Sequence, residues 1–225
     1  MDPPLLQAHD LAFAYAGTPV LVGVDLQVRA GACCIIRGDN GTGKSTLLQL
    51  LQGRLQPSQG WVRLEGRPLQ GHRRRVAFVP QAPSLNWRYP IRLEALVALA
   101  ANGDPRSSPP ALRLVGLEGL GKRPIGSLSS GQRQRALIAR ALAQRAAVLL
   151  LDEPFACLDG DSRLQLGALV RSLVRAGTAV VLSAHGALPP TLPRVHPYLL
   201  QAGSLHPHPA QPSLTPWQHW TNPSG

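Results

Sequence analysis

Length, composition and charge exclude several classes of protein. The 225 residues can bury the core of one domain, or of a domain with a subdomain, and no apolar run approaches the ~20 residues of a membrane span. The first residues, Met1 to Pro4, have neither the basic nor the apolar part of a signal peptide, and three cysteines form no disulfide framework, which fits a reducing cytosol. The net charge of +11 invites a nucleic-acid partner. We expect none, because the one dense basic cluster, at 73–75, has no interleaved aromatic residues.

Hydrophobic periodicity predicts an α/β fold. Alternating apolar and polar residues in the first thirty positions indicate two half-buried strands around a turn at 17–19. Four continuous apolar runs are typical of strands buried on both faces, and they span 32–36, 76–79, 148–151 and 179–182. Helical patterns lie between them at 46–52, 132–145 and 161–176. Buried strands that alternate with helices predict a mainly parallel sheet, with the N-terminal strands forming an antiparallel β subdomain beside it.

Two segments depart from this alternation. Short helical patterns at 93–101 and 111–117 flank a polar, proline-rich stretch, so we expect a small inserted helical subdomain over residues 83–135. After Ala202 the chain loses its periodicity and gains proline. We therefore predict a single domain over 1–203 and a loosely ordered tail over 204–225.

The segment from Gly38 to Ser45 reads GDNGTGKS and matches the phosphate-binding loop pattern, directly between a buried strand and a helix. Glycines let backbone N–H groups curl around phosphates, and the positive end of the following helix dipole adds to this. Lys44 is expected to contact the β- and γ-phosphates of ATP and the Ser45 hydroxyl to ligate Mg²⁺. A plain glycine-rich turn, the alternative, does not account for Lys-Ser at this offset. The predicted nucleotide-binding residues of the loop are Gly38, Asp39, Asn40, Gly41, Thr42, Gly43, Lys44, Ser45 and Thr46.

A pair of carboxylates, Asp152 and Glu153, ends the buried run at 148–151. We expect this strand to be the neighbour of the strand that leads to the phosphate loop. Asp152 then reaches the Mg²⁺ shell, and Glu153 deprotonates or orients the attacking water. Capping of the next helix is the alternative, but Pro154 follows directly and the chain holds only twelve acidic residues. The two motifs together predict a P-loop NTPase core that hydrolyses a nucleotide.

The segment from Leu128 to Gln132 reads LSSGQ and resembles the signature motif of ABC transporter ATPases, usually LSGGQ. The resemblance extends from Leu11 to about Gly203. Four further positions match the family motifs in the same order along the chain, namely Tyr15, Gln81, Asp159 and His185. Three residues depart from the usual pattern without removing a group that carries the chemistry, namely Ser130, Cys157 and Gly186.

The resemblance implies roles for these residues. Tyr15 would stack on adenine, Gln81 would touch Mg²⁺ or the attacking water and sense a membrane partner, and His185 would hold the γ-phosphate and the water in line. The implied catalytic residues are Glu153, His185, Gln81 and Lys44, and the implied Mg²⁺ ligands are Ser45, Gln81 and Asp152.

The signature implies a homodimer. Ser129, Gly131 and Gln132 would cap the γ-phosphate of the nucleotide bound to a second subunit, which makes two composite sites. Asp159 would communicate across the dimer.

A cargo is suggested by residues 86–90, which read NWRYP and resemble the corresponding stretch of ATPases from zinc and manganese importers. Generic aromatic packing in the helical subdomain is the alternative for this stretch. The importer resemblance implies integral-membrane permease subunits, a secreted metal-binding protein in the same system, and a cytoplasmic position, peripheral on the inner face of the cell membrane.

Two other functions stay open, a heme exporter and a soluble ABC ATPase that acts on nucleic acid or ribosomes. Histidines of the tail region, among them His206, His208 and His219, suggest metal sensing, although alternating His-Pro in a loose tail is more often incidental.

Overall fold

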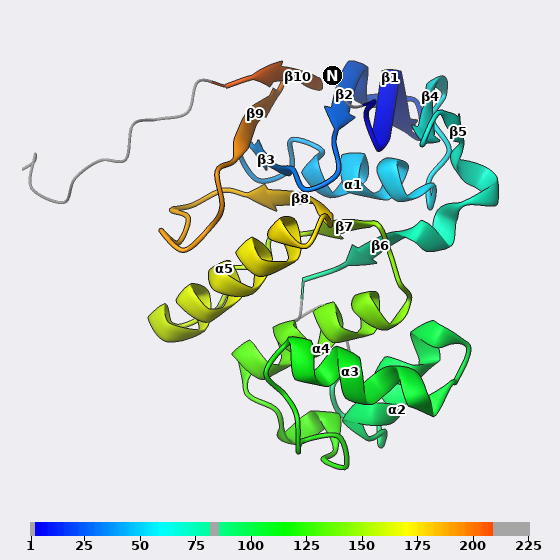
Figure 1. Ribbon diagram of the computed structural model, residues 1–225. Helices are drawn as coiled ribbons and strands as arrows, with labels where there is room; N and C mark the ends of the chain where they lie inside the picture. The colour runs from blue at the N-terminus through cyan, green and yellow to red at the C-terminus, as the bar shows by residue number, and fades with distance from the viewer. Residues whose placement is uncertain (1–2, 82–85, 209–225) are drawn as a thin grey trace, which may run out of the picture.

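The computed structural model describes residues 3–81 and 86–208 as two β-sheets with helices packed against them (Figure 1). The strands are β1 (Leu6–Tyr15), β2 (Thr18–Val28), β3 (Cys33–Arg37), β4 (Gln59–Leu64), β5 (Arg67–Pro68), β6 (Val76–Val79), β7 (Val148–Leu151), β8 (Ala179–Ala184), β9 (His196–Gln201) and β10 (Ser204–Pro207). The α-helices are α1 (Lys44–Gln52), α2 (Leu93–Ala98), α3 (Ser108–Leu114), α4 (Ser130–Ala143) and α5 (Gly160–Arg175). No helix in these described ranges is long and apolar enough to cross a bilayer.

The central sheet has the strand order β10-β9-β3-β8-β7-β6. The pairings β9–β3, β3–β8, β8–β7 and β7–β6 are parallel, and only β10 runs antiparallel to its neighbour. Every residue of β7 and β8 is buried, as continuous apolar strands of a parallel sheet should be. The smaller sheet, β2-β1-β4-β5, is antiparallel.

Alternation along the central strands divides the core into two parts. Leu149 and Leu151 of β7 face a cluster that includes α4 and α5, whereas Val148 and Leu150 face a cluster that includes α1 and the antiparallel sheet. Figure 1 shows α1 between the two sheets, α5 beneath β8, and α2, α3 and α4 together at the far end. The predicted α/β class, with an antiparallel N-terminal sheet and a parallel-rich central sheet, is confirmed.

One predicted neighbour is wrong. The acidic strand β7 does not pair with β3, the strand before the phosphate loop, because β8 lies between them. An apolar run indicates that a strand is buried, but it does not indicate which strands are its neighbours in the sheet. The helical crossovers determine the strand order.

Element boundaries also differ from expectation. Strand β10 begins at Ser204, inside the segment predicted as a loose tail, because it pairs with β9 through a tight turn at 202–203. Residues 209–225, including His219, lie outside the described residues. Helix α4 begins at Ser130, two residues earlier than expected, because Ser129 and Gln132 form a reciprocal capping box.

Candidate functional site

The loop between β3 and α1 is closed around the ammonium group of Lys44. This group donates hydrogen bonds to the carbonyl oxygens of Gly38 and Asp39, both at 2.8 Å, and the side chain is 5 % exposed. At Gly43 the backbone φ is 100°, and a Cβ atom would lie 2.9 Å from a methyl group of Val20. Both the conformation and the close approach require glycine here. The motif glycine thus sets the shape of the loop in which Lys44 lies.

A pocket of about 380 Å³ opens beside this loop. Its walls come from the loop and α1, from the end of β1 and the start of β2, and from the segments that follow β6 and β7. The lining residues are Tyr15, Val20, Asn40, Gly41, Gly43, Lys44, Ser45, Thr46, Gln81 and Glu153. Seven predicted nucleotide-binding residues, together with Gln81 and Glu153, therefore share one pocket. Tyr15 lies at the rim of this pocket and is 49 % exposed.

Glu153 lies between two cationic or potentially cationic side chains. Its Oε1 is 3.7 Å from Lys44 Nζ, and its Oε2 is 2.6 Å from Nδ1 of His185. Glu153 and His185 also line a second pocket, of about 330 Å³. Three residues from three separate motifs are thus in one chain of contacts, with the carboxylate of Glu153 at its centre.

Asp152 is 7 % exposed and is held from the neighbouring strand. Its Oδ1 accepts a hydrogen bond of 2.7 Å from the Ser183 hydroxyl of β8, and the same hydroxyl accepts one of 2.8 Å from the Glu153 backbone N–H. The intervening β8 therefore connects to both acidic residues at the end of β7.

The residues of the signature motif lie outside the pocket beside the phosphate loop. Ser129 caps α4, and Gly131 is buried against Ser162 at the start of α5. Ser162 donates hydrogen bonds to Asp159 from its backbone N–H at 2.8 Å and from its hydroxyl at 2.9 Å. The backbone hydrogen bond in particular lowers the pKa of Asp159. Among the described residues that line the pocket beside the phosphate loop, none is a signature residue.

The family follows from comparison with known proteins. Residues 21–156, more than half of the chain, match the family model described as ABC transporter. The chain belongs to this family.

Relatives of this ABC ATPase have different cargoes in their names. It is 35 % identical to the zinc transport system ATP-binding protein TroB of Treponema pallidum, over 80 % of this chain and 72 % of that protein. It is 36 % identical to the cytochrome c biogenesis ATP-binding export protein CcmA of Xanthomonas axonopodis pv. citri, over 82 % of this chain and 88 % of that protein. A solved structure, cbiO1 from Clostridium perfringens, is similar with a TM-score of 0.80 and 26 % identity, over 91 % of this chain and 87 % of that one. The ABC ATPase is therefore an ATP-hydrolysing transporter subunit, and its relatives do not agree on a cargo.

Two side chains of the ABC ATPase that the sequence analysis did not single out join the motif segments. Ser183 is one. Arg163, on α5, donates a hydrogen bond of 3.0 Å to the carbonyl oxygen of Phe155 and a second one to that of Ala187, two residues after His185. The available signal for Ser183 was its position directly after the apolar run at 179–182, where the strand continues with a polar residue. For Arg163 no local pattern was available, since both of its partners are backbone atoms distant in sequence.

Two of the residues predicted to bind Mg²⁺ have oxygen atoms that fit this ion chemically. This ion prefers hard oxygen ligands and is usually bound through one or two carboxylates plus substrate phosphates. The ABC ATPase supplies one carboxylate at Asp152 and a hydroxyl at Ser45. In the described ranges no three His, Cys, Asp or Glu side chains gather closely enough to bind a metal on their own.

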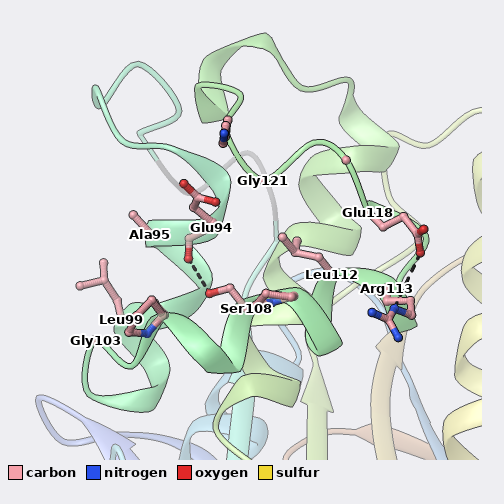
Figure 2. A pocket seen from close by; sticks show the side chains of 14 residues that line it. Glu94, Ala95, Leu99, Gly103, Ser108, Leu112, Arg113, Glu118 and Gly121 are labelled. Atoms are coloured by element: carbon pink, nitrogen blue, oxygen red, sulfur yellow. Dashed lines mark hydrogen bonds and ion pairs between the residues drawn. The ribbon is translucent and has the colours of Figure 1, made fainter.

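A larger pocket, of about 860 Å³, lies among the helices at the far end and contains none of the predicted site residues (Figure 2). It lies between α2, α3 and the segment at 118–122. On its wall, the buried Ser108 hydroxyl donates a hydrogen bond of 2.7 Å to the backbone carbonyl of Glu94.

Proposed function

We propose that the pocket beside the phosphate loop is the ATP site of an ABC transporter motor. The observation that carries this is the contact chain that starts at Lys44 and Glu153 on the pocket wall and continues from Glu153 to His185. Residues Gly38 to Thr46 hold the phosphates, and Tyr15 stacks on adenine from the rim. Asp152, Ser45 and Gln81 bind Mg²⁺, which neutralises the charge of the phosphates when bound.

Hydrolysis then transfers the γ-phosphoryl group of ATP to water, giving ADP and inorganic phosphate. Glu153 accepts a hydrogen bond from the attacking water or takes its proton, because its carboxylate faces the pocket and is only 11 % exposed. Lys44 donates to the phosphate oxygens, and His185 orients Glu153 and the γ-phosphate. Positioning and charge stabilisation, rather than covalent chemistry, are what such a site contributes.

The separation of the signature from this pocket supports a homodimer with two composite sites. Ser129 and Gly131 lie at the N-terminal end of α4, where backbone N–H groups and the helix dipole favour an anion. With Gln132 they would reach the γ-phosphate of the partner subunit's nucleotide. One subunit alone would then have little activity.

For the domain organisation, we propose one ATPase domain over 1–203 that β10 extends to Pro207, with 83–135 as an inserted helical subdomain and a tail after β10. The ATPase works as a peripheral subunit on the cytoplasmic face of the membrane, bound to separate permease subunits.

We propose a zinc- or manganese-type cation as cargo. Similarity to TroB and the NWRYP stretch at 86–90 support this. Within that stretch Trp87 is buried in the helical core, which agrees with a packing role, whereas Tyr89 is 63 % exposed and is available to a permease. A secreted metal-binding protein would complete such an importer.

Heme-related export is the second candidate, because the chain covers 88 % of CcmA, more than of TroB. Metal content and metal uptake in cells with and without the gene decide between the two. Loss of zinc or manganese uptake supports the first candidate. Normal metal uptake with loss of c-type cytochromes contradicts it and supports the second.

The site itself is tested by Glu153→Gln. We expect ATP binding to persist while turnover falls about 100-fold or more, since a positioned general base contributes on this order. Turnover within about threefold of wild type contradicts the role of Glu153.

For the composite site, Ser129→Trp is expected to abolish turnover without weakening ATP binding by the monomer. Loss of monomer affinity contradicts the assignment in trans.

A further inference from the structure

Ser183 is a fully buried serine in an otherwise apolar strand. Strand β8 reads Ala-Val-Val-Leu-Ser-Ala, and the exposure of Ser183 is 0 %. The strand lies between β3, which leads to the phosphate loop, and β7, which ends at the two acids. A buried hydroxyl is unfavourable unless its hydrogen bonds are made, so its partners explain its presence.

The Ser183 hydroxyl contacts both acidic residues from a single atom. It lies 2.7 Å from Asp152 Oδ1 and 2.8 Å from the backbone nitrogen of Glu153. A hydroxyl has one hydrogen, and a backbone N–H can only donate. Ser183 therefore accepts from Glu153 and gives its only hydrogen to the Asp152 carboxylate. Each of its two hydrogen bonds has a fixed direction.

The backbone of Glu153 has particular need of this partner. Its φ of 44° lies in the left-handed region, which is unfavourable for a residue with a Cβ atom and persists where surrounding contacts impose it. The hydrogen bond from the Glu153 N–H to Ser183 is such a contact. This backbone conformation directs the side chain toward Lys44 and His185.

We infer that Ser183 is a positioning residue of the ATPase, which orients Asp152 toward the metal and Glu153 toward the attacking water. The inference rests on the roles proposed above for those two acids. Ser183 itself does not line the pocket beside the phosphate loop in the described part of the chain. Its effect reaches the substrate through the two residues that it holds.

The test compares four variants with wild type. Ser183→Ala removes the hydroxyl. The side chains introduced by Ser183→Thr and Ser183→Val have nearly the same shape, and only threonine has a hydroxyl. If the alanine variant does not fold, this pair shows whether the hydroxyl is required. Ser108→Ala is the matched control, because Ser108 is also buried (1 %) with its hydroxyl bonded to a backbone carbonyl, but at the wall of the distant pocket (Figure 2).

Two measurements separate positioning from mere stability. In Ser183→Ala we expect kcat to fall about 10–100-fold, as for residues that orient a metal ligand. The KM for ATP should stay within about threefold, since the phosphate loop is untouched. Mn²⁺ binding with a non-hydrolysable ATP analogue, followed by electron paramagnetic resonance, should weaken about tenfold. Ser108→Ala should lower the urea midpoint without changing kcat or Mn²⁺ binding.

The outcomes are distinct. Recovery of turnover in Ser183→Thr but not in Ser183→Val supports the inference. Wild-type kcat and Mn²⁺ affinity in folded Ser183→Ala, or equal turnover in the Thr and Val variants, overturns it. Glu153→Gln is assayed in parallel. If that variant retains turnover, the proposed role of Glu153 fails; if it is inactive while Ser183→Ala is fully active, only the positioning inference fails.

Discussion

The contact between Gly131 and Ser162 gives a prediction about why the signature requires glycine. A Cβ atom on Gly131 would lie 2.9 Å from the Ser162 Cβ, and its hydroxyl would be closer still. Such overpacking of a buried contact typically costs about 1–3 kcal/mol. For a chain of this size, each kcal/mol lowers the melting temperature by about 2–4 °C. We therefore expect Gly131→Ala to lower the free energy of unfolding by about 1–3 kcal/mol.

Ser162→Gly removes both clashing atoms and is the natural rescue. Alone it costs about 1 kcal/mol or less through helix propensity, and it also removes the hydrogen bond from the Ser162 hydroxyl to Asp159. In the Gly131→Ala/Ser162→Gly double variant the new methyl group occupies the space that Ser162 has left. Its stability should therefore be higher than the sum of the single effects, by about 1 kcal/mol or more. Urea unfolding followed by circular dichroism measures all four corners of this cycle.

Additive effects, to within about 0.5 kcal/mol, would refute the steric argument. The same variants also separate packing from function. The proposed contact of Gly131 with the partner subunit's nucleotide uses its backbone N–H, which alanine keeps, and the new methyl group points at Ser162. Turnover of the double variant should therefore return with its stability, and turnover that stays low despite restored stability would contradict a purely steric role of the glycine.

Two further predictions concern Lys44 and Asp159. Lys44→Ala should weaken ATP binding about 10–100-fold, the worth of a hydrogen bond to a charged group, whereas the exposed Lys122→Ala should bind normally in the same fluorescent-nucleotide titration. The lowered pKa of Asp159 means that its carboxylate stabilises the folded state above the unfolded pKa of about 3.9, and that this contribution is lost as pH falls through the folded value. Asp159→Asn keeps a capping oxygen without the charge, so the difference in stability between wild type and this variant should shrink from pH 7 to pH 3. Urea unfolding midpoints measure this difference, and an equal difference in midpoint at both pH values would contradict the prediction.

The strands that were predicted have a clear pattern in the sequence. Strands β1 and β2 alternate apolar and polar residues, and four central strands are buried on both faces. β3, β6, β7 and β8 are short apolar runs, and burial on both sides leaves such a pattern. Strand β9 was missed because it includes Pro197 and only Leu200 is fully buried. Strand β4 was missed because Gly60 and partly buried residues interrupt its alternation. Partly buried strands without a regular pattern are specified by tertiary pairing more than by their own sequence.

The site was predictable where a motif fixes local geometry. Gly43 and Lys44 lie in one loop, and their arrangement follows from backbone conformation and helix start. The contacts of Glu153 with Lys44 and His185 join three motifs, and only the sheet order brings them together. That order was the part predicted incorrectly, which is also why the residue on the intervening strand, Ser183, escaped notice.

Strand β8 explains how the two halves of the site are held in register. It pairs with β3 on one side, where Ser183 is opposite Ile36, and with β7 on the other, where Leu182 is opposite Leu151. Because side chains alternate along a strand, a shift of β8 by one residue would turn the Ser183 hydroxyl away from both acids and bring Leu182 or Ala184 to them. The same shift would displace His185 from Glu153. The geometry of the carboxylates therefore depends on the register of a strand that contains neither of them.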